Sequence, residues 1–148
     1  MCDIIISGVF DGTLKYGRPK GVELYVVKDI SDLSFYSIGS ANNGGGTDGP
    51  EFTLSGTASA GSYIYVIASK NDSEFKTFFG FTPSKVFQTG HMLINGNDAV
   101  ELFKSIEGKS MVIDTYGVAN KDGQGTSWDY MDGWAYRING GGGTFCES

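Results

Sequence analysis

Residues 94–103, Ile-Asn-Gly-Asn-Asp-Ala-Val-Glu-Leu-Phe, decide the fold class of this chain. Asn95 and Gly96 tolerate positive φ, which predicts that residues 95–98 form a tight hairpin turn. In the residues that follow, positions 100, 102 and 104 fall on one face and positions 99, 101 and 103 on the other, as in a β-strand. A turn that feeds an alternating strand indicates an all-β protein. The stretch contains no recognisable catalytic motif.

The composition also fits a β-rich domain. The chain has 148 residues, enough to bury a full core, and we expect residues 1–148 to form a single domain. Its 23 glycines, 14% aromatic content and 19% charged content suit short strands joined by many turns. No apolar run approaches the ~20 residues that a membrane-spanning helix needs.

The charge of the chain bears on its partners. The formal net charge is -6 and the isoelectric point is about 4.6. Because an acidic surface repels the phosphate backbone, nucleic acid is a disfavoured partner. We expect no signal peptide in this chain, since residues 1–3 lack a basic start and the apolar run at residues 4–6 is short.

Strand-like segments recur along the chain without the strand–helix alternation of a parallel sheet. We expect strands at residues 4–10, 22–28, 35–40, 51–54, 63–68, 110–116 and 134–137, with shorter ones at 86–87 and 92–94. The strand at residues 63–68 should be central because its side chains are all apolar or aromatic. Residues 11–21 should form a polar loop broken by glycine and proline, and residues 42–50 an exposed glycine-rich loop. The pattern predicts a two-sheet β-sandwich of about eight or nine short strands.

One segment favours a helix. Asn71 or Asp72 suits the N-cap, acidic residues follow in the first turn, and three phenylalanines then recur at i, i+3 and i+4. We expect residues 72–79 to form the one short helix, ended by Gly80. Residues 139–148 should form a flexible glycine-rich tail.

Several segments match one family pattern in order and spacing. They include Val22-Glu23-Leu24-Tyr25, Ala60-Gly61-Ser62-Tyr63, Asn95-Gly96-Asn97-Asp98 and Asp132-Gly133-Trp134-Ala135. Over residues 3–143 this pattern resembles the lamin tail domain, in its bacterial and environmental branch. The resemblance implies an immunoglobulin-like β-sandwich that serves as a non-catalytic interaction or attachment module. It also implies an extracellular or periplasmic location, because that branch is often found on secreted proteins.

The chain departs from this family at two positions. Gly8 stands where relatives often carry an acidic residue after the first-strand serine, and Asn97 stands where they often carry aspartate. Both changes remove negative charge, which weakens the idea of a shared acidic site.

Nothing in the sequence indicates catalysis. His91 is the single histidine, so any Ser-His-Asp or Cys-His arrangement would have to use it, and it lies at a turn. Zinc would need three or four Cys or His ligands, and only Cys2, His91 and Cys146 exist. We therefore expect a protein that is not an enzyme and has no cofactor, with calcium as the one metal to weigh.

Calcium favours the oxygen ligands that two loops offer. One set is Asn95, Asn97 and Asp98, joined by Asp11 or Glu23 from neighbouring strands. The other is Asp122, Asp129 and Asp132. The alternative interpretation is that these residues only build turns, with Asp98 capping the backbone amides of its own turn. Glu23 and Glu101 lie within strands and need a partner such as Arg137.

The aromatic residues near the C-terminus suggest a binding platform. Trp134 and Tyr136 share one strand face and should belong to the core. Trp128 and Tyr130 are the better candidates for the surface, where they could stack on a sugar or a peptide. The leading interpretation is nevertheless that these two also lie in the core, because large aromatic side chains are mostly buried.

The two cysteines lie near the two ends of the chain. A disulfide between Cys2 and Cys146 is geometrically feasible in a sandwich, and two free thiols are the alternative.

The leading functional hypothesis is a non-catalytic binding or attachment module that contacts a protein or a cell surface through an exposed strand edge or apolar patch. One alternative is a carbohydrate- or calcium-dependent ligand-binding domain that uses Trp128 and Tyr130 or the Asp98 turn. A second alternative is an accessory domain of an extracellular nuclease or another secreted enzyme.

Overall fold

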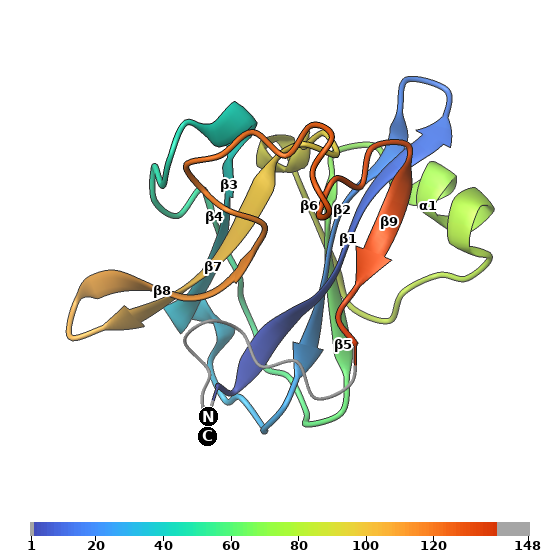
Figure 1. The fold of residues 1–148 in the computed structure, drawn as a ribbon. Helices are drawn as coiled ribbons and strands as arrows, with labels where there is room; N and C mark the ends of the chain where they lie inside the picture. Colours follow the sequence, from blue (N-terminus) through green and yellow to red (C-terminus); the bar gives the residue numbers. More distant parts are fainter. Residues whose placement is uncertain (1, 139–148) are drawn as a thin grey trace.

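A β-sandwich of nine strands with one α-helix accounts for residues 2–138, the part of the chain that the computed structural model describes (Figure 1). One layer is a five-stranded sheet in the order β6-β5-β2-β1-β9. Its strands are β1 (Ile4–Leu14), β2 (Arg18–Val26), β5 (Tyr63–Ala68), β6 (Val86–Thr89) and β9 (Gly133–Tyr136). Its neighbours pair antiparallel except β5 and β6, which are parallel.

The other layer is a four-stranded antiparallel sheet in the order β4-β3-β7-β8. Its strands are β3 (Tyr36–Ala41), β4 (Phe52–Thr53), β7 (Ala99–Ile106) and β8 (Lys109–Tyr116). The two layers confirm the expected all-β sandwich. The tail expected at residues 139–148 lies outside the described residues.

The core lies between the sheets and follows the alternation of their strands. Val22 and Leu24 on β2 and Val100 and Leu102 on β7 have no exposed surface. Each such side chain contributes ~1.5–3 kcal/mol on burial. A bulge after Ile6 interrupts the alternation of inward and outward side chains on β1. Beyond the bulge, every second side chain again faces the core.

The turn at residues 95–98 forms, but it is not a hairpin. The amide of Asp98 donates to the carbonyl of Asn95 at 2.9 Å, which closes the turn. It joins the 3-10 helix Gly90–Met92 to β7, and β7 pairs with β3 and β8. The expected strand at residues 92–94 is therefore wrong.

Glycine is required at position 96 because the backbone of Met131 passes close to it, and not because the residue needs a positive φ. Neither Asn95 nor Gly96 has a positive φ. A Cβ at position 96 would lie 1.9 Å from the backbone nitrogen of Met131, so no larger residue fits where the two chain segments cross.

The polar loop expected at residues 11–21 is also wrong. Strands β1 and β2 continue through it, and Asp11 pairs with Lys20 and Leu14 with Arg18. The register shifts between Asp11 and Leu14, and a Cβ at Gly12 would lie 2.4 Å from the carbonyl oxygen of Arg18. The glycine there lets two paired strands approach each other instead of ending them.

The helix α1 (Asp72–Phe79) has the bounds that the sequence predicts, and it ends at Gly80 with φ 80°. Phe75 is buried and packs with Phe10, Tyr65 and Phe79 on the outer side of the five-stranded sheet. The helix therefore covers one part of that outer face (Figure 1). In residues 2–138 no helix has both the length and the apolarity to cross a membrane.

Candidate functional site

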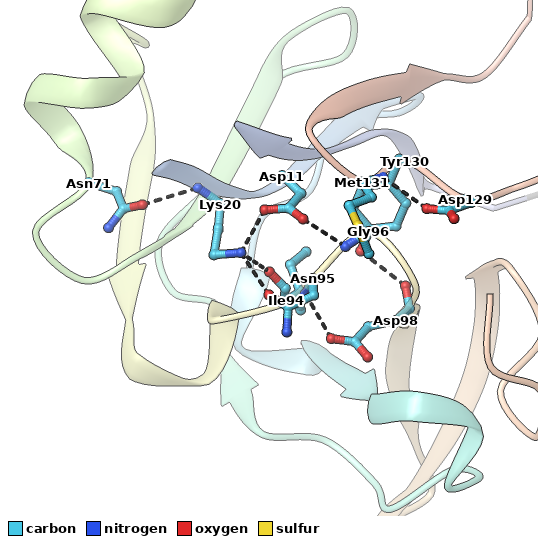
Figure 2. Close-up of polar contacts among 10 residues, drawn as sticks. All are labelled: Asp11, Lys20, Asn71, Ile94, Asn95, Gly96, Asp98, Asp129, Tyr130 and Met131. Carbon is cyan, nitrogen blue, oxygen red and sulfur yellow. Dashed lines mark hydrogen bonds and ion pairs between the residues drawn. The ribbon is translucent and has the colours of Figure 1, made fainter. Parts of the chain in front are cut away.

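The turn at residues 95–98 lies in a polar network that centres on Lys20 (Figure 2). The Lys20 ammonium donates to Asp11 Oδ1 at 2.6 Å, to the Ile94 carbonyl at 2.9 Å and to Asn95 Oδ1 at 2.9 Å. The side chains of Lys20 and Asp11 are only 12% and 6% exposed. All three donors of the ammonium group are therefore used inside the protein.

The carboxylates of the network bind backbone amides. Asp11 Oδ2 accepts from the Gly96 amide at 2.9 Å, which ties β1 to the turn. Asp98 is buried, and its two oxygens accept from the amides of Asn95 and Asn43, each at 2.8 Å. Asp98 thus caps its own turn and also holds the start of the 42–50 loop.

Asn97 links two further loops. Its Nδ2 donates to Asn43 Oδ1 and to Asp122 Oδ1, each at 2.9 Å. Asp122 also accepts from the Gln124 amide, and these two donors hold the pKa of Asp122 below its usual value. The structure therefore brings Asn95, Asn97 and Asp98 into one polar network.

The polar network determines which oxygen atoms and which charges a calcium ion would encounter at the turn. Asp11 joins the set, whereas Glu23 lies on the opposite, outer side of the five-stranded sheet. Lys20 already supplies a positive charge among these oxygens, and an ion would have to displace it. No group of three or more His, Cys, Asp or Glu residues suited to a metal occurs within residues 2–138. Calcium binding at this turn stays a prediction.

Trp128 and Tyr130, the two candidates for a surface platform, are packed into the protein, as the core interpretation predicted. Tyr130 is buried, and its hydroxyl donates to the Asp98 carbonyl at 3.0 Å. Trp128 is half-buried and lies against Gly117 and Gly123, where a Cβ would come within 2.8 and 2.4 Å of its ring. Ring contacts of Tyr116 with both residues complete the cluster. Sugar or peptide binding by Trp128 and Tyr130 stays a prediction, but both rings are already packed.

Trp134 and Tyr136, expected in the core, are each 54% exposed. They lie on one face of β9, and the small Ala135 between them is the residue that packs toward the core. Trp134 contacts the rings of Phe78 and Phe79 on α1, so its face of β9 is the outer one. The two faces of β9 are therefore the reverse of the expectation: Trp134 and Tyr136 face outward, and Ala135 faces the core.

Tyr136 belongs to a group of tyrosines on the outer face of the five-stranded sheet. Register places Tyr136 beside Gly8, Gly8 beside Glu23, and Glu23 beside Tyr65. Tyr25 and Tyr63 pair in the next row, with ring centroids 5.2 Å apart. We define the tyrosine face as Glu23, Tyr25, Tyr63, Tyr65 and Tyr136.

Glu23 is the acidic centre of the tyrosine face and is half-buried. Its Oε2 accepts from the Tyr65 hydroxyl at 2.5 Å, and its Oε1 accepts from Ser7 Oγ at 2.7 Å. Within the described residues, no Lys, Arg or His nitrogen lies within 4.0 Å of this carboxylate. Two neutral hydroxyl groups therefore fix the carboxylate, and no cation from residues 2–138 neutralises it.

Burial and the carboxylate act together on the neighbouring phenols. Burial, and then Glu23, raise the pKa of Tyr65 and of Tyr136. Tyr136 and Tyr63 raise the pKa of Tyr65 further, so the phenol groups lie near one another around Glu23. Gly8 allows the Tyr136 ring to lie this close to Glu23, since a Cβ at position 8 would lie 2.9 Å from Cδ1 of Tyr136.

The tyrosine face was missed at the sequence level, although a signal existed. Residues 23 and 25 and residues 63 and 65 each occupy alternate positions, and tyrosines fill three of those four positions. Alternation places each pair on a single face. The sequence does not reveal that these faces are adjacent, because that depends on strand order.

The remaining polar candidates have other partners than expected. Arg137 pairs with Asp114 at 2.6 Å, and not with Glu23 or Glu101. Glu101 is buried and accepts from Thr47 Oγ1 at 2.9 Å. The side chain of His91 is 57% exposed, as expected for a turn residue.

The predicted cysteine pair is only partly within the described residues. Cys2 Sγ lies 3.7 Å from the Ile113 carbonyl oxygen, and Cys146 lies outside residues 2–138. The Cys2–Cys146 disulfide stays a prediction.

Comparison with protein-family models, with curated proteins and with solved structures finds no match to this chain. The resemblance to the lamin tail domain therefore stays a prediction.

Proposed function

We propose that this protein is a non-catalytic binding module that contacts a protein partner through the tyrosine face. The single observation that carries the proposal is the exposure of large aromatic side chains on one side of one sheet. Tyr136 is 54% exposed and Tyr63 is 47% exposed, and Trp134, two residues before Tyr136 on β9, is 54% exposed. Scattered exposed aromatics need no explanation, but a gathered set is typical of an interaction surface.

The polar network around Lys20 supports the same proposal by contrast. Its charged groups bind one another and the backbone, and the side chains of Lys20, Asp11 and Asp98 are nearly buried. Such a network positions loops and strands. On the tyrosine face, by contrast, Tyr63 and Tyr136 expose about half of their surface, while Tyr65 is buried against Phe75 and Phe81.

Carbohydrate is the second candidate ligand for the same surface. Trp134 and Tyr136 are two residues apart on an edge strand, so their exposed rings are ~7 Å apart along it. Exposed rings in a row can stack on sugar rings. The residues involved would then be Trp134 and Tyr136, in place of Trp128 and Tyr130.

The experiment applies the folded protein to a random-peptide array and to a glycan array. The double variant Tyr63→Ala/Tyr136→Ala should lose binding at least about tenfold, because it removes two exposed ring surfaces of a contact centre. Phe35→Ala is the matched control, since Phe35 is 52% exposed and lies outside the tyrosine face.

Three outcomes decide between the candidates. Peptide ligands that need Tyr63 and Tyr136 support the proposal. Glycan ligands alone favour carbohydrate instead. Ligands that bind the double variant as well as the native protein, or blank results on both arrays, contradict the proposal.

A further inference from the structure

We infer that the tyrosine face is a receptor for a positively charged side chain, lysine or arginine, of a protein partner, with Glu23 as its counter-ion. This inference rests on the proposed function and names the chemistry of its ligand.

The first observation is the incomplete neutralisation of Glu23. The nearly buried Asp11 has Lys20 at 2.6 Å, and the buried Asp114 has Arg137 at 2.6 Å. The half-buried Glu23 has only two hydroxyl donors among the described residues. A carboxylate that is partly removed from water and still reachable from the surface gains from an added cation.

The second observation is the unused capacity of the carboxylate. Each oxygen of an ionised Glu can accept two hydrogen bonds. Oε1 receives one side-chain donor from Ser7 and Oε2 receives one from Tyr65. One position on each oxygen is left for N–H donors of an ammonium or guanidinium group, and the present donors hold the carboxylate in place to receive them.

The third observation is the ring surface around the charge. The exposed ring of Tyr136 lies over Gly8 on one side of Glu23; on the other side the buried Tyr65 contributes its hydroxyl group. The Tyr25–Tyr63 pair forms the adjoining row, with planes inclined at 51°. Cations bind tyrosine faces through the ring quadrupole, and the aliphatic stem of Lys or Arg packs on the same rings.

The surroundings favour a protein as the source of the cation. Val86 is 38% exposed and Phe81 is 43% exposed, next to Tyr65 by pairing and by ring contact. Trp134 extends the apolar surface on the other side. A charged centre with an apolar surround fits a basic side chain that projects from an apolar protein surface. The net charge of -6 also speeds the approach of a basic partner.

The first test uses the peptides selected on the random-peptide array. Lysine or arginine should be enriched at one position, and Glu23→Gln should weaken binding about tenfold, since it removes the counter-ion. Glu107→Gln is the matched control, because it removes the same charge from an exposed turn away from the face and should leave affinity unchanged. Gln at position 23 still accepts a hydrogen bond, and the melting temperature reports whether each variant is folded.

The second test needs no variant. N-acetyl-lysine methylamide and its uncharged analogue N-acetyl-norleucine methylamide are titrated into the native protein, and amide chemical shifts are followed. The lysine compound should move the amides of Glu23, Tyr65 and Tyr136 more than the norleucine compound does. Equal shifts with both compounds, or none with the lysine compound, would overturn the inference.

The outcomes separate this inference from the proposed function. If Glu23→Gln binds the peptides as tightly as the native protein does while Tyr63→Ala/Tyr136→Ala does not, the face binds without a cation and only the inference fails. If both variants bind normally, the proposed function fails as well. If phosphatidylcholine vesicles bind in a Glu23-dependent way and basic peptides do not, the cation comes from a lipid headgroup and the protein-partner inference is overturned.

Discussion

The ammonium nitrogen of Lys20 lies 2.6 Å from Oδ1 of Asp11, and the other oxygen of Asp11 holds the Gly96 amide at 2.9 Å. One nearly buried ion pair therefore connects the β1–β2 ribbon to the turn before β7, across the two sheets of the sandwich.

Lys20→Met should destabilise the fold by about 3 kcal/mol, because it leaves the buried Asp11 carboxylate without its cation. Urea denaturation at pH 7 measures the loss. Lys104→Met is the matched control, since the Lys104–Asp3 pair is 34% and 28% exposed and should contribute less than about 1 kcal/mol. Equal losses for the two variants would show that burial of the Lys20 pair is unimportant.

Gly96→Ala should cost at least about 2 kcal/mol, because a Cβ there would lie 1.9 Å from backbone that cannot rotate away. Thermal denaturation checks the change. Gly90→Ala serves for comparison: a Cβ at Gly90 meets nothing within 4 Å, so the expected change is within about 0.5 kcal/mol. A Gly96→Ala protein that melts like the native one would mean that the two crossing segments are not in close contact.

The third prediction concerns Glu101, which is buried under the 42–50 loop. Burial raises the pKa of Glu101 above its usual 4.5; the hydrogen bond from the Thr47 hydroxyl opposes this in part, and the nearby Asp48 adds a smaller increase. The folded protein therefore binds the proton more tightly than the unfolded chain. Stability falls as the pH rises from about 4.5 through the raised pKa, and it does not recover above it.

Glu101→Gln should remove this fall, so its advantage over the native protein should grow with pH and then level off. Melting temperatures between pH 4 and pH 8 measure it. Asp3→Asn should act with the opposite sign, because the Lys104 hydrogen bond holds the pKa of Asp3 below 3.8 and stabilises the fold above that range. Parallel curves for the native protein and Glu101→Gln would rule out a raised pKa.

The parts of the fold that local sequence determines were predictable. Helix α1 depends on acidic residues in its first turn, on three phenylalanines at helical spacing and on Gly80, all within ten residues. Strand β7 follows from strict alternation. The strand through residues 11–14 was not predictable, because Gly12 marks a close approach to Arg18 that no local pattern reveals.

The candidate site was predictable only in part. Asp98 does cap its turn, as one interpretation held, but no sequence pattern places Lys20 at the centre of the network. The core position expected for Trp134 and Tyr136 was wrong, because alternation fixes which residues of a strand share a face and does not fix which face meets the core.

The parallel pairing of β5 and β6 has a consequence for the evolution of the exposed surface. Parallel neighbours cannot be joined by a tight turn, and here residues 69–85 make the crossover and include α1. The crossover therefore covers part of the outer face of the five-stranded sheet, and its length can vary. Its helix accounts for ~12 Å of that length. Insertions or deletions in residues 69–85 would enlarge or shrink the sheltered area, so relatives could retain both sheets and still present very different contact surfaces.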